Sequence, residues 1–201
     1  MVLVMVLLLA GASVAYKKFA NASASNALVL AGNAQAEENK TDAPESKDSI
    51  PADSEKTADE PSSVSLAPDF TVYDQDGNEV TLSSFFGKPI VLNFWASWCP
   101  PCRMEMPDFN QAYLELGSKV HFLMVNMTAG RETKQSAQEF IQEENFSFPV
   151  YFDLSQNAAV TYGAYSLPTT YFIDASGAAV AYATGAIDAD TLRGAIDMIL
   201  R

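Results

Sequence analysis

Hydrophobic and polar positions divide the chain into three stretches. No charged side chain occurs before Lys17, and that first stretch is strongly apolar. Between residues 37 and 61 the chain is rich in Glu, Asp, Ser, Ala, Lys and Pro, and Ile50 is the only large aliphatic residue. From Ala67 onward, continuous apolar runs alternate with amphipathic ones. We therefore predict these parts: a membrane segment over 1–19, an acidic flexible tether over 20–66 and a folded domain over 67–201.

The first stretch is expected to be a retained membrane anchor. As a helix it would be about 24 Å long, short of the roughly 30 Å hydrocarbon core, so its length leaves a signal peptide open as the alternative. Ala34-Gln35-Ala36 fits a signal-peptidase site but lies about 18 residues past the apolar run, too far for ordinary cleavage. Lys17 and Lys18 follow the run, whereas an extracytoplasmic domain calls for basic residues before it. A chain start upstream of Met1 would supply them.

The pattern within the domain predicts alternating strands and helices. Ile90–Trp95 is a continuous apolar run, typical of a central strand covered on both faces. Asp76-Gly77 and Ser176-Gly177 are turn signals and predict two hairpins. The other expected elements are strands over 69–73, 79–82, 120–127, 150–153, 169–174 and 178–184, helices over 100–116, 134–145 and 188–200, and a helical turn over 158–162. The first helix is expected to point these side chains at the core: Met104, Phe109, Ala112, Tyr113 and Leu116. This order implies an α/β domain with a mixed central sheet flanked by helices.

The net charge and the number of cysteines exclude several classes of function. The chain has 12 Lys and Arg against 25 Asp and Glu, a net charge of -13 that repels polyanions, so we expect no nucleic-acid binding. Cys99 and Cys102 are the only cysteines, which excludes a scaffold of several disulfides and a four-thiolate zinc site within one chain. His121 is the only histidine. We expect no metal site and no cofactor beyond the Cys99–Cys102 pair.

The cysteine pair lies where a buried strand is expected to end and a helix to begin. Backbone N–H groups and the helix dipole stabilise a thiolate there, so Cys99 is expected to have a lowered pKa and to be the nucleophile. Cys102, one turn further, is expected to resolve the mixed disulfide. Pro100 and Pro101 suit a first helical turn, where missing N–H groups cost little. An inert staple is disfavoured because so short a loop yields little entropic stabilisation, and a two-thiolate metal site is the other alternative.

The segment Val91–Cys102, followed by Glu105-Met106-Pro107, resembles the thioredoxin superfamily. Within it, the chain resembles the TlpA/ResA-like branch of membrane-tethered thiol–disulfide oxidoreductases. The resemblance covers the whole predicted domain and implies a thioredoxin fold with an N-terminal β-hairpin extension. Ser166–Asp174 is similar to the cis-proline segment of that superfamily. This likeness implies that Pro168 is cis and that Leu167 offers its backbone to a substrate chain.

The same resemblance assigns the remaining site residues. Ordinary thioredoxins carry a buried aspartate where this chain has Asn93, which cannot exchange a proton. Glu105 matches the branch pattern and is implied to transfer a proton to and from Cys102. The alternative is that Glu105 only favours the N-terminal half of its helix electrostatically. The residues implied to contact substrate are Trp98, Pro100, Pro101, Leu167 and Pro168.

The resemblance implies a bacterial, monomeric enzyme of cell redox homeostasis on the extracytoplasmic side of a single-pass cell-membrane anchor. It would reduce protein disulfides and be recharged by a membrane electron donor of the thiol-transfer type. Cytochrome c maturation and support of methionine sulfoxide reductase are the outlets it suggests. The alternatives are a disulfide-forming oxidant, a peroxiredoxin-like peroxidase, which the cysteine spacing disfavours, and a copper or haem-pathway chaperone.

Overall fold

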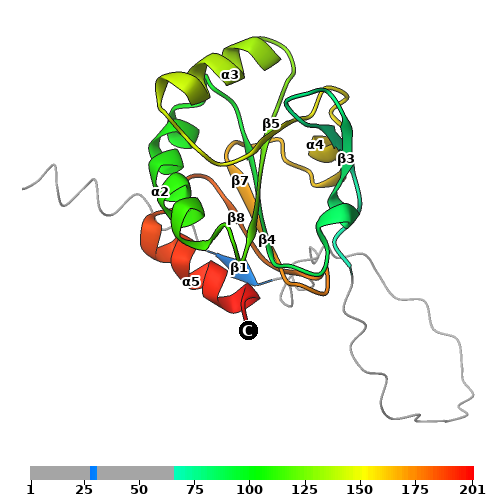
Figure 1. Cartoon of the computed structure of the whole chain (residues 1–201), viewed down its shortest axis with the longest axis vertical. Helices are drawn as coiled ribbons and strands as arrows, with labels where there is room; N and C mark the ends of the chain where they lie inside the picture. The colour runs from blue at the N-terminus through cyan, green and yellow to red at the C-terminus, as the bar shows by residue number, and fades with distance from the viewer. Residues whose placement is uncertain (1–27, 31–65) are drawn as a thin grey trace, which may run out of the picture.

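The computed structural model describes residues 28–30 and 66–201, which form one mixed sheet with helices on both faces (Figure 1). The predicted membrane segment over 1–19 lies outside the described residues, as does most of the predicted tether over 20–66. Among the residues described, no helix is both long and apolar enough to cross a bilayer.

The sheet has eight strands in the order β1-β8-β7-β4-β5-β6-β2-β3. Their bounds are β1 Val29–Leu30, β2 Thr71–Tyr73, β3 Glu79–Thr81, β4 Ile90–Trp95, β5 His121–Asn126, β6 Val150–Phe152, β7 Thr169–Ile173 and β8 Ala179–Thr184. β4, β5 and β6 are parallel neighbours, and every other adjacent pair is antiparallel. β4 lies in the centre and all its residues are buried, as its continuous apolar run predicts.

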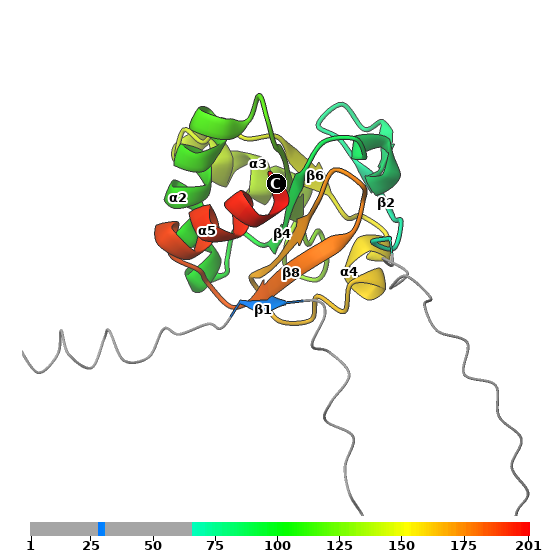
Figure 2. The ribbon, with the colours of Figure 1, turned by 90° about the horizontal axis from the view of Figure 1, so that it is seen from below.

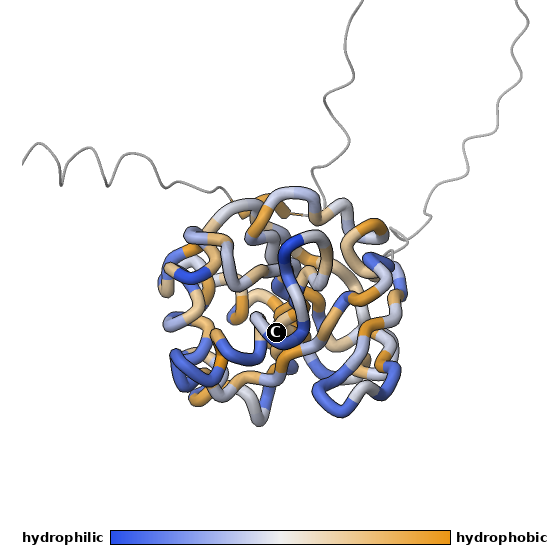
Figure 3. Tube along the Cα trace, turned by 90° about the horizontal axis from the view of Figure 1, so that it is seen from above, coloured by the Kyte–Doolittle hydropathy of each residue, from blue (hydrophilic) through white to orange (hydrophobic). Residues whose placement is uncertain are grey.

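The helices divide between the two faces of the sheet (Figure 2). Their bounds are η2 Leu82–Phe85, α2 Pro100–Leu116, α3 Lys134–Glu143, α4 Asn157–Thr161 and α5 Ala189–Ile199. α2, α3 and α5 cover one face, where Phe109 and Ile196 pack in one core. α4 and η2 cover the other face, where Tyr162 and Leu82 pack with Phe94 in a second core. Hydrophilic residues gather at the outer turns of the trace, and the hydrophobic ones run through its interior (Figure 3).

The mixed α/β architecture and both predicted hairpins are confirmed. Val72 pairs with Val80 in the extension β2–β3, and Tyr171 pairs with Tyr182 in β7–β8. Gly77 lies in the first turn with a φ of +88°, a left-handed conformation that glycine adopts without a steric penalty. The predicted helices begin and end within about two residues of the observed ones, which is the usual spread of helix boundaries.

One predicted core position on α2 is wrong. Met104 is 70% exposed, whereas Met106 is fully buried. Successive helical residues are about 100° apart, so the buried stripe runs from Cys102 through Met106 to Phe109 and leaves Met104 on the opposite side.

The short strand β1 lies within the range that we predicted to be tether. Val29 pairs with Tyr182 and Leu30 with Ala181, so β1 extends the sheet beyond β8. The run Leu28-Val29-Leu30 has only three large apolar residues among Ala, Asn and Ser, too few to predict a strand. So short a strand owes its conformation to the backbone groups of the edge that it pairs with.

Candidate active site

Cys99 and Cys102 form a disulfide at the start of α2, where the sequence predicts the chemistry. Their Cα atoms are 5.3 Å apart. Cys99 is the N-cap residue of α2, and its sulfur accepts a hydrogen bond from the Cys102 backbone N–H at 3.3 Å. Cys99 is 2% exposed and Cys102 is fully buried. The helix start therefore presents backbone donors to the Cys99 sulfur, which is the arrangement that stabilises a thiolate.

The disulfide is carried on a tight turn between β4 and α2. The Cys99 N–H donates to the Ala96 carbonyl at 3.1 Å, which closes this turn. Pro100 and Pro101 occupy the first helical positions, where no N–H donor is lost from the helix. The cysteines therefore lie at the edge of the sheet where the buried strand β4 ends.

The peptide bond between Leu167 and Pro168 is cis, in agreement with the resemblance. The Pro168 carbonyl accepts the Gly185 N–H at 2.7 Å, which ties this turn to the end of β8. Thr169 follows directly and is the register partner of Phe94 in β4. This pairing brings Leu167 to the same end of the sheet as Cys99.

An apolar groove of about 420 Å³ opens beside the disulfide. The residues that line it are Trp98, Cys99, Pro100, Pro101, Met127, Ala129, Gln156, Ala159, Val160, Ala164, Tyr165 and Leu167. Trp98 and Tyr165 lie on its wall and are 42% and 78% exposed. The fold thus gathers Trp98, Pro100, Pro101 and Leu167 of the predicted contact residues around Cys99, and Pro168 lies next to the wall rather than in it.

Glu105 lies in the core beneath the disulfide. It follows Cys102 by three residues on α2, a spacing that places the two side chains on the same helix face. Glu105 is 2% exposed, and its carboxyl accepts hydrogen bonds from Asn93 Nδ2 at 2.8 Å and from the Ile187 N–H at 3.0 Å. Burial raises the pKa of Glu105 to about 8, although both hydrogen bonds act in the opposite direction. The carboxyl is therefore mostly protonated at neutral pH.

Asn93 links Glu105 to the neighbouring strand. Its Nδ2 also donates to Thr170 Oγ1 at 3.0 Å, and the residue is fully buried. Within the described part of the chain, Asn93 Oδ1 is one of the buried side-chain atoms that have no hydrogen-bond partner. Because Asn93 and Thr170 do not titrate in the physiological range, Glu105 is the titratable member of this group of three buried side chains.

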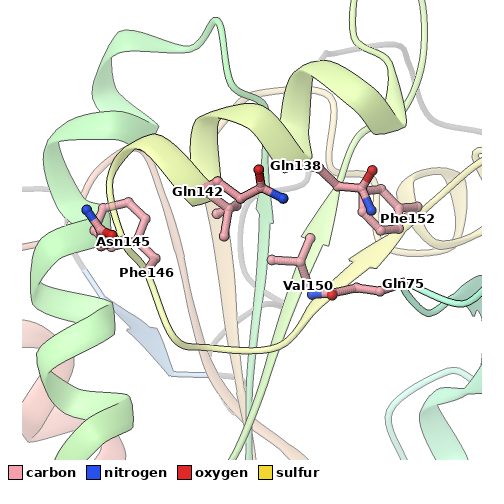
Figure 4. Close-up of a pocket in the computed structure, with 8 residues that line it drawn as sticks. Gln75, Gln138, Gln142, Asn145, Phe146, Val150 and Phe152 are labelled. Atoms are coloured by element: carbon pink, nitrogen blue, oxygen red, sulfur yellow. The ribbon is translucent and has the colours of Figure 1, made fainter.

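A second hollow, of about 450 Å³, lies between α3 and β6 and contains none of the predicted site residues. Gln138 and Gln142 of α3 stand opposite Val150 and Phe152 of β6 there (Figure 4). The side chains of this hollow are neutral and none is a nucleophile. Within residues 28–30 and 66–201, no group of three or more His, Cys, Asp or Glu side chains is placed to hold a metal ion.

Sequence reasoning missed two residues that contact the turn before Cys99. Glu132 accepts hydrogen bonds from the Ser97 N–H at 3.0 Å and from Ser97 Oγ at 2.8 Å. The Arg131 guanidinium lies over the Trp98 ring, 3.9 Å from its centroid. These contacts span about 35 residues of sequence and follow no local motif, so no pattern signal pointed to them.

Comparison with known proteins agrees with this geometry. Residues 65–182 match the AhpC/TSA family. The chain is 34% identical over 136 residues to the thiol-disulfide oxidoreductase ResA of Geobacillus thermodenitrificans, a match that covers 67% of this chain and 76% of the relative. It is also 34% identical over 111 residues to the thioredoxin-like protein YneN of Bacillus subtilis, covering 55% of this chain and 65% of that protein.

Solved structures show the same likeness. A thiol:disulfide interchange protein DsbE from Chlorobium tepidum superposes with a TM-score of 0.61 at 32% identity, over 68% of this chain and 96% of that one. The exposed lipoprotein thioredoxin Etrx1 of Streptococcus pneumoniae superposes with a TM-score of 0.58 at 30% identity, over 65% of this chain and 99% of that one. The fold is therefore the thioredoxin fold with a hairpin extension. The chain belongs to the AhpC/TSA family and is a thiol–disulfide oxidoreductase of the ResA and DsbE type.

Proposed function

We propose that the chain reduces protein disulfides on the extracytoplasmic side of the cell membrane, through the dithiol form of Cys99 and Cys102. The observation that carries the proposal is the disulfide itself, which lies at a helix start and opens onto an apolar groove. An apolar groove beside a nucleophilic sulfur suits an extended or unfolded protein segment, because such a segment exposes side chains that a folded one buries.

The reaction proceeds by two exchanges. The Cys99 thiolate attacks a sulfur of the substrate disulfide, forms a mixed disulfide and releases one substrate thiolate. The Cys102 thiolate then attacks the Cys99 sulfur, which breaks the mixed disulfide and releases the second substrate thiolate. The substrate gains two electrons, and the enzyme is left with the Cys99–Cys102 disulfide seen in the structure.

Glu105 serves the second exchange as the base for Cys102. Its pKa of about 8 is close to the ordinary value of a thiol, about 8.5, and closely matched pKa values favour proton transfer in either direction. At pH 7 about one tenth of such a carboxyl is ionised and able to accept the Cys102 proton. An ordinary exposed Glu would be fully ionised and too weak a base.

Recharging requires a dithiol donor, because each turnover leaves the enzyme oxidised. We assign this task to a membrane protein of the thiol-transfer type, with the domain held as a monomer near the membrane by an N-terminal anchor over 1–19. The similarity to ResA and DsbE supports this assignment. Cytochrome c maturation and methionine sulfoxide reductase support are the outlets we would examine first.

The direction of electron flow is tested by the reduction potential of the Cys99–Cys102 pair. The purified chain is equilibrated with glutathione redox buffers, with Cys99→Ser and Cys102→Ser as controls that cannot close the disulfide. We expect a potential near about −270 mV, as in thioredoxin. A value near about −120 mV would make the protein an oxidant and overturn the proposed direction.

The attacking cysteine is tested by trapping. Reduced Cys102→Ser protein is mixed with an unfolded protein that contains disulfides, and we expect a mixed disulfide to accumulate at Cys99. The same mixture with Cys99→Ser protein should trap far less, because Cys99 lines the groove beside the disulfide and Cys102 does not. Equal trapping by the two variants would contradict the assigned roles.

Peroxidase activity is the second candidate, and the match to the AhpC/TSA family favours it. Peroxide consumption by the reduced chain, measured against the rate of disulfide reduction, separates the two activities. We expect disulfide reduction to be the faster reaction.

A further inference from the structure

A buried carboxylate lies in the turn between β5 and α3. Glu132 is 3% exposed, and a carboxylate so far from water is costly unless hydrogen bonds compensate. Its Oε1 accepts the Ser97 N–H at 3.0 Å and Asn126 Nδ2 at 2.9 Å, and its Oε2 accepts Ser97 Oγ at 2.8 Å. Two elements far apart in sequence therefore converge on this one side chain.

The partner of Glu132 is part of the turn that carries the nucleophile. Ser97 lies two residues before Cys99, between the end of β4 and the start of α2. Its backbone N–H lies outside both the strand and the helix, so the carboxylate supplies a bond that regular secondary structure does not. Fixing both the N–H and the hydroxyl of Ser97 sets the path of the chain into Cys99.

Neighbouring residues extend this contact. The Arg131 guanidinium lies over the ring of Trp98. Two adjacent residues of the β5–α3 turn therefore contact two adjacent residues of the turn before Cys99. The β5–α3 turn is itself anchored, because the Met127 N–H donates to the Trp95 carbonyl at 2.8 Å. The turn is thus tied to both β4 and β5 and can act as a rigid support.

We propose that Glu132 is a positioning residue for thiol–disulfide exchange, which holds the Ser97–Trp98 turn so that the Cys99 sulfur stays at the start of α2. The inference rests on the proposed function for the reaction that it serves. Glu132 acts through Ser97, because its carboxylate accepts hydrogen bonds from Ser97 and Asn126 and not from the cysteines. Displacing a reacting atom by about 1 Å can cost on the order of 10²-fold in rate, so loss of this support should slow the reaction at Cys99.

The hydrogen bonds of Glu132 allow its positioning role to be tested separately from its negative charge. A Gln side chain can keep all of the contacts, because its Oε1 can accept from the Ser97 N–H and from Asn126 while its Nε2 donates to Ser97 Oγ. A hydroxyl both donates and accepts, so only the direction of that one bond is reversed. Glu132→Gln therefore keeps the bonds and removes the charge, whereas Glu132→Ala removes both.

The hairpin extension offers a matched control. Asp69 also holds one serine by its N–H and hydroxyl, since it accepts the Ser83 N–H at 2.9 Å and Ser83 Oγ at 2.6 Å. Asp69 does not line the groove beside the disulfide. Asp69→Ala therefore removes the same kind of contact at a place where it cannot position Cys99.

The experiment measures two properties of the reduced full chain. The first is the rate at which it reduces oxidised glutathione at pH 7. The second is the apparent pKa of Cys99, obtained from the pH dependence of its alkylation by iodoacetamide in a Cys102→Ser background. Thermal unfolding of each variant reports stability separately.

We expect Glu132→Ala to slow the exchange about 10- to 100-fold and to raise the Cys99 pKa toward the ordinary thiol value. Glu132→Gln should restore both properties, and Asp69→Ala should lower the melting temperature without changing either. The proposal is overturned if Glu132→Ala only lowers the melting temperature, or if Glu132→Gln is as damaging as Glu132→Ala. Should the unmutated chain reduce neither oxidised glutathione nor an unfolded protein that contains disulfides, the proposed function fails, while the alkylation pKa still decides the role of Glu132.

Discussion

The hairpin turn and the core beneath the disulfide each hold a carboxyl that accepts several hydrogen bonds, with opposite results. Asp74, in the exposed turn between β2 and β3, accepts Asn78 Nδ2 at 3.0 Å, the Asn78 N–H at 2.8 Å and the Asp76 N–H at 2.9 Å. The hydrogen bonds from Asn78 hold the pKa of Asp74 below its usual value. Burial instead raises the pKa of Glu105 to about 8.

The difference shows that access to water decides whether hydrogen bonding lowers the pKa of a carboxyl or burial raises it. In the turn, the ionised carboxylate keeps its hydration and gains donors, so the charged form is favoured. In the core, two donors do not replace the hydration that is lost, and the neutral form is favoured. The charge of Asp74 therefore helps to hold the turn, whereas burial in the core keeps Glu105 protonated.

The largest expected effect is that of Glu105→Gln on the resolving step. General acid–base catalysis contributes about 10²- to 10⁴-fold, so resolution of the mixed disulfide should slow by that factor. Stopped-flow measurement of the release of Cys99 from a preformed mixed disulfide, over a range of pH, tests this. An unchanged rate with the same pH dependence would leave Glu105 with only a structural role.

The same substitution should change the pH dependence of stability. The folded-state pKa of about 8 lies above the unfolded value of 4.5, so the folded chain binds more protons between these values and its stability falls as the pH rises. The shift corresponds to about 5 kcal/mol lost from pH 4.5 to pH 8, as an order of magnitude. Urea unfolding at a series of pH values should show this decline, and Glu105→Gln should remove it. A decline that persists in Glu105→Gln would assign it to other groups.

Met104 and Met106 of α2 allow the effect of burial on stability to be compared at two residues of the same type. Met106→Ala should lower the free energy of unfolding by about 2–5 kcal/mol, because it leaves a cavity in the core. Met104→Ala, at a side chain that is 70% exposed, should change it by less than about 0.5 kcal/mol. Denaturant unfolding of both variants measures the difference, and similar costs would contradict the observed helix face.

The smallest effect is expected for Asp74→Ala in the hairpin turn. Folding lowers the pKa of Asp74 below its unfolded-state pKa of 3.8. Its contribution to the free energy of unfolding is therefore present above pH 3.8 and is lost as the pH falls through the folded-state pKa. The variant should melt slightly below the parent chain at neutral pH, and the gap should close in acid. A gap that stays constant with pH would mean that the charge of Asp74 plays no part.

Much of the fold could be predicted because local signals and tertiary structure agree. The apolar run of β4, the turn residues of both hairpins and the prolines at the start of α2 each favour the conformation that the structure shows. The prediction for Met104 is wrong because its apolar side chain lies on the exposed side of α2. β1 was missed because its conformation depends on pairing with β8.

The candidate site could be predicted only in part. Cys99, Cys102 and Glu105 lie within seven consecutive residues, at intervals of three along α2, so a short motif contains them all. Ser97 and Glu132 are 35 residues apart, and Glu105 and Ile187 are 82 residues apart, so no local pattern reveals their contacts. Those contacts form only once the sheet brings β4, β5 and β8 to one edge.

The sequence by itself determined which atoms can react, because the identity and spacing of the cysteines and prolines are local properties of one strand-to-helix junction. The tertiary structure decided how those atoms behave. It removed Glu105 from water, which raised the pKa of its carboxyl, and it placed Glu132 against the turn before Cys99. Burial and long-range hydrogen bonding depend on the whole packed chain, and for this reason no segment read alone could have revealed them.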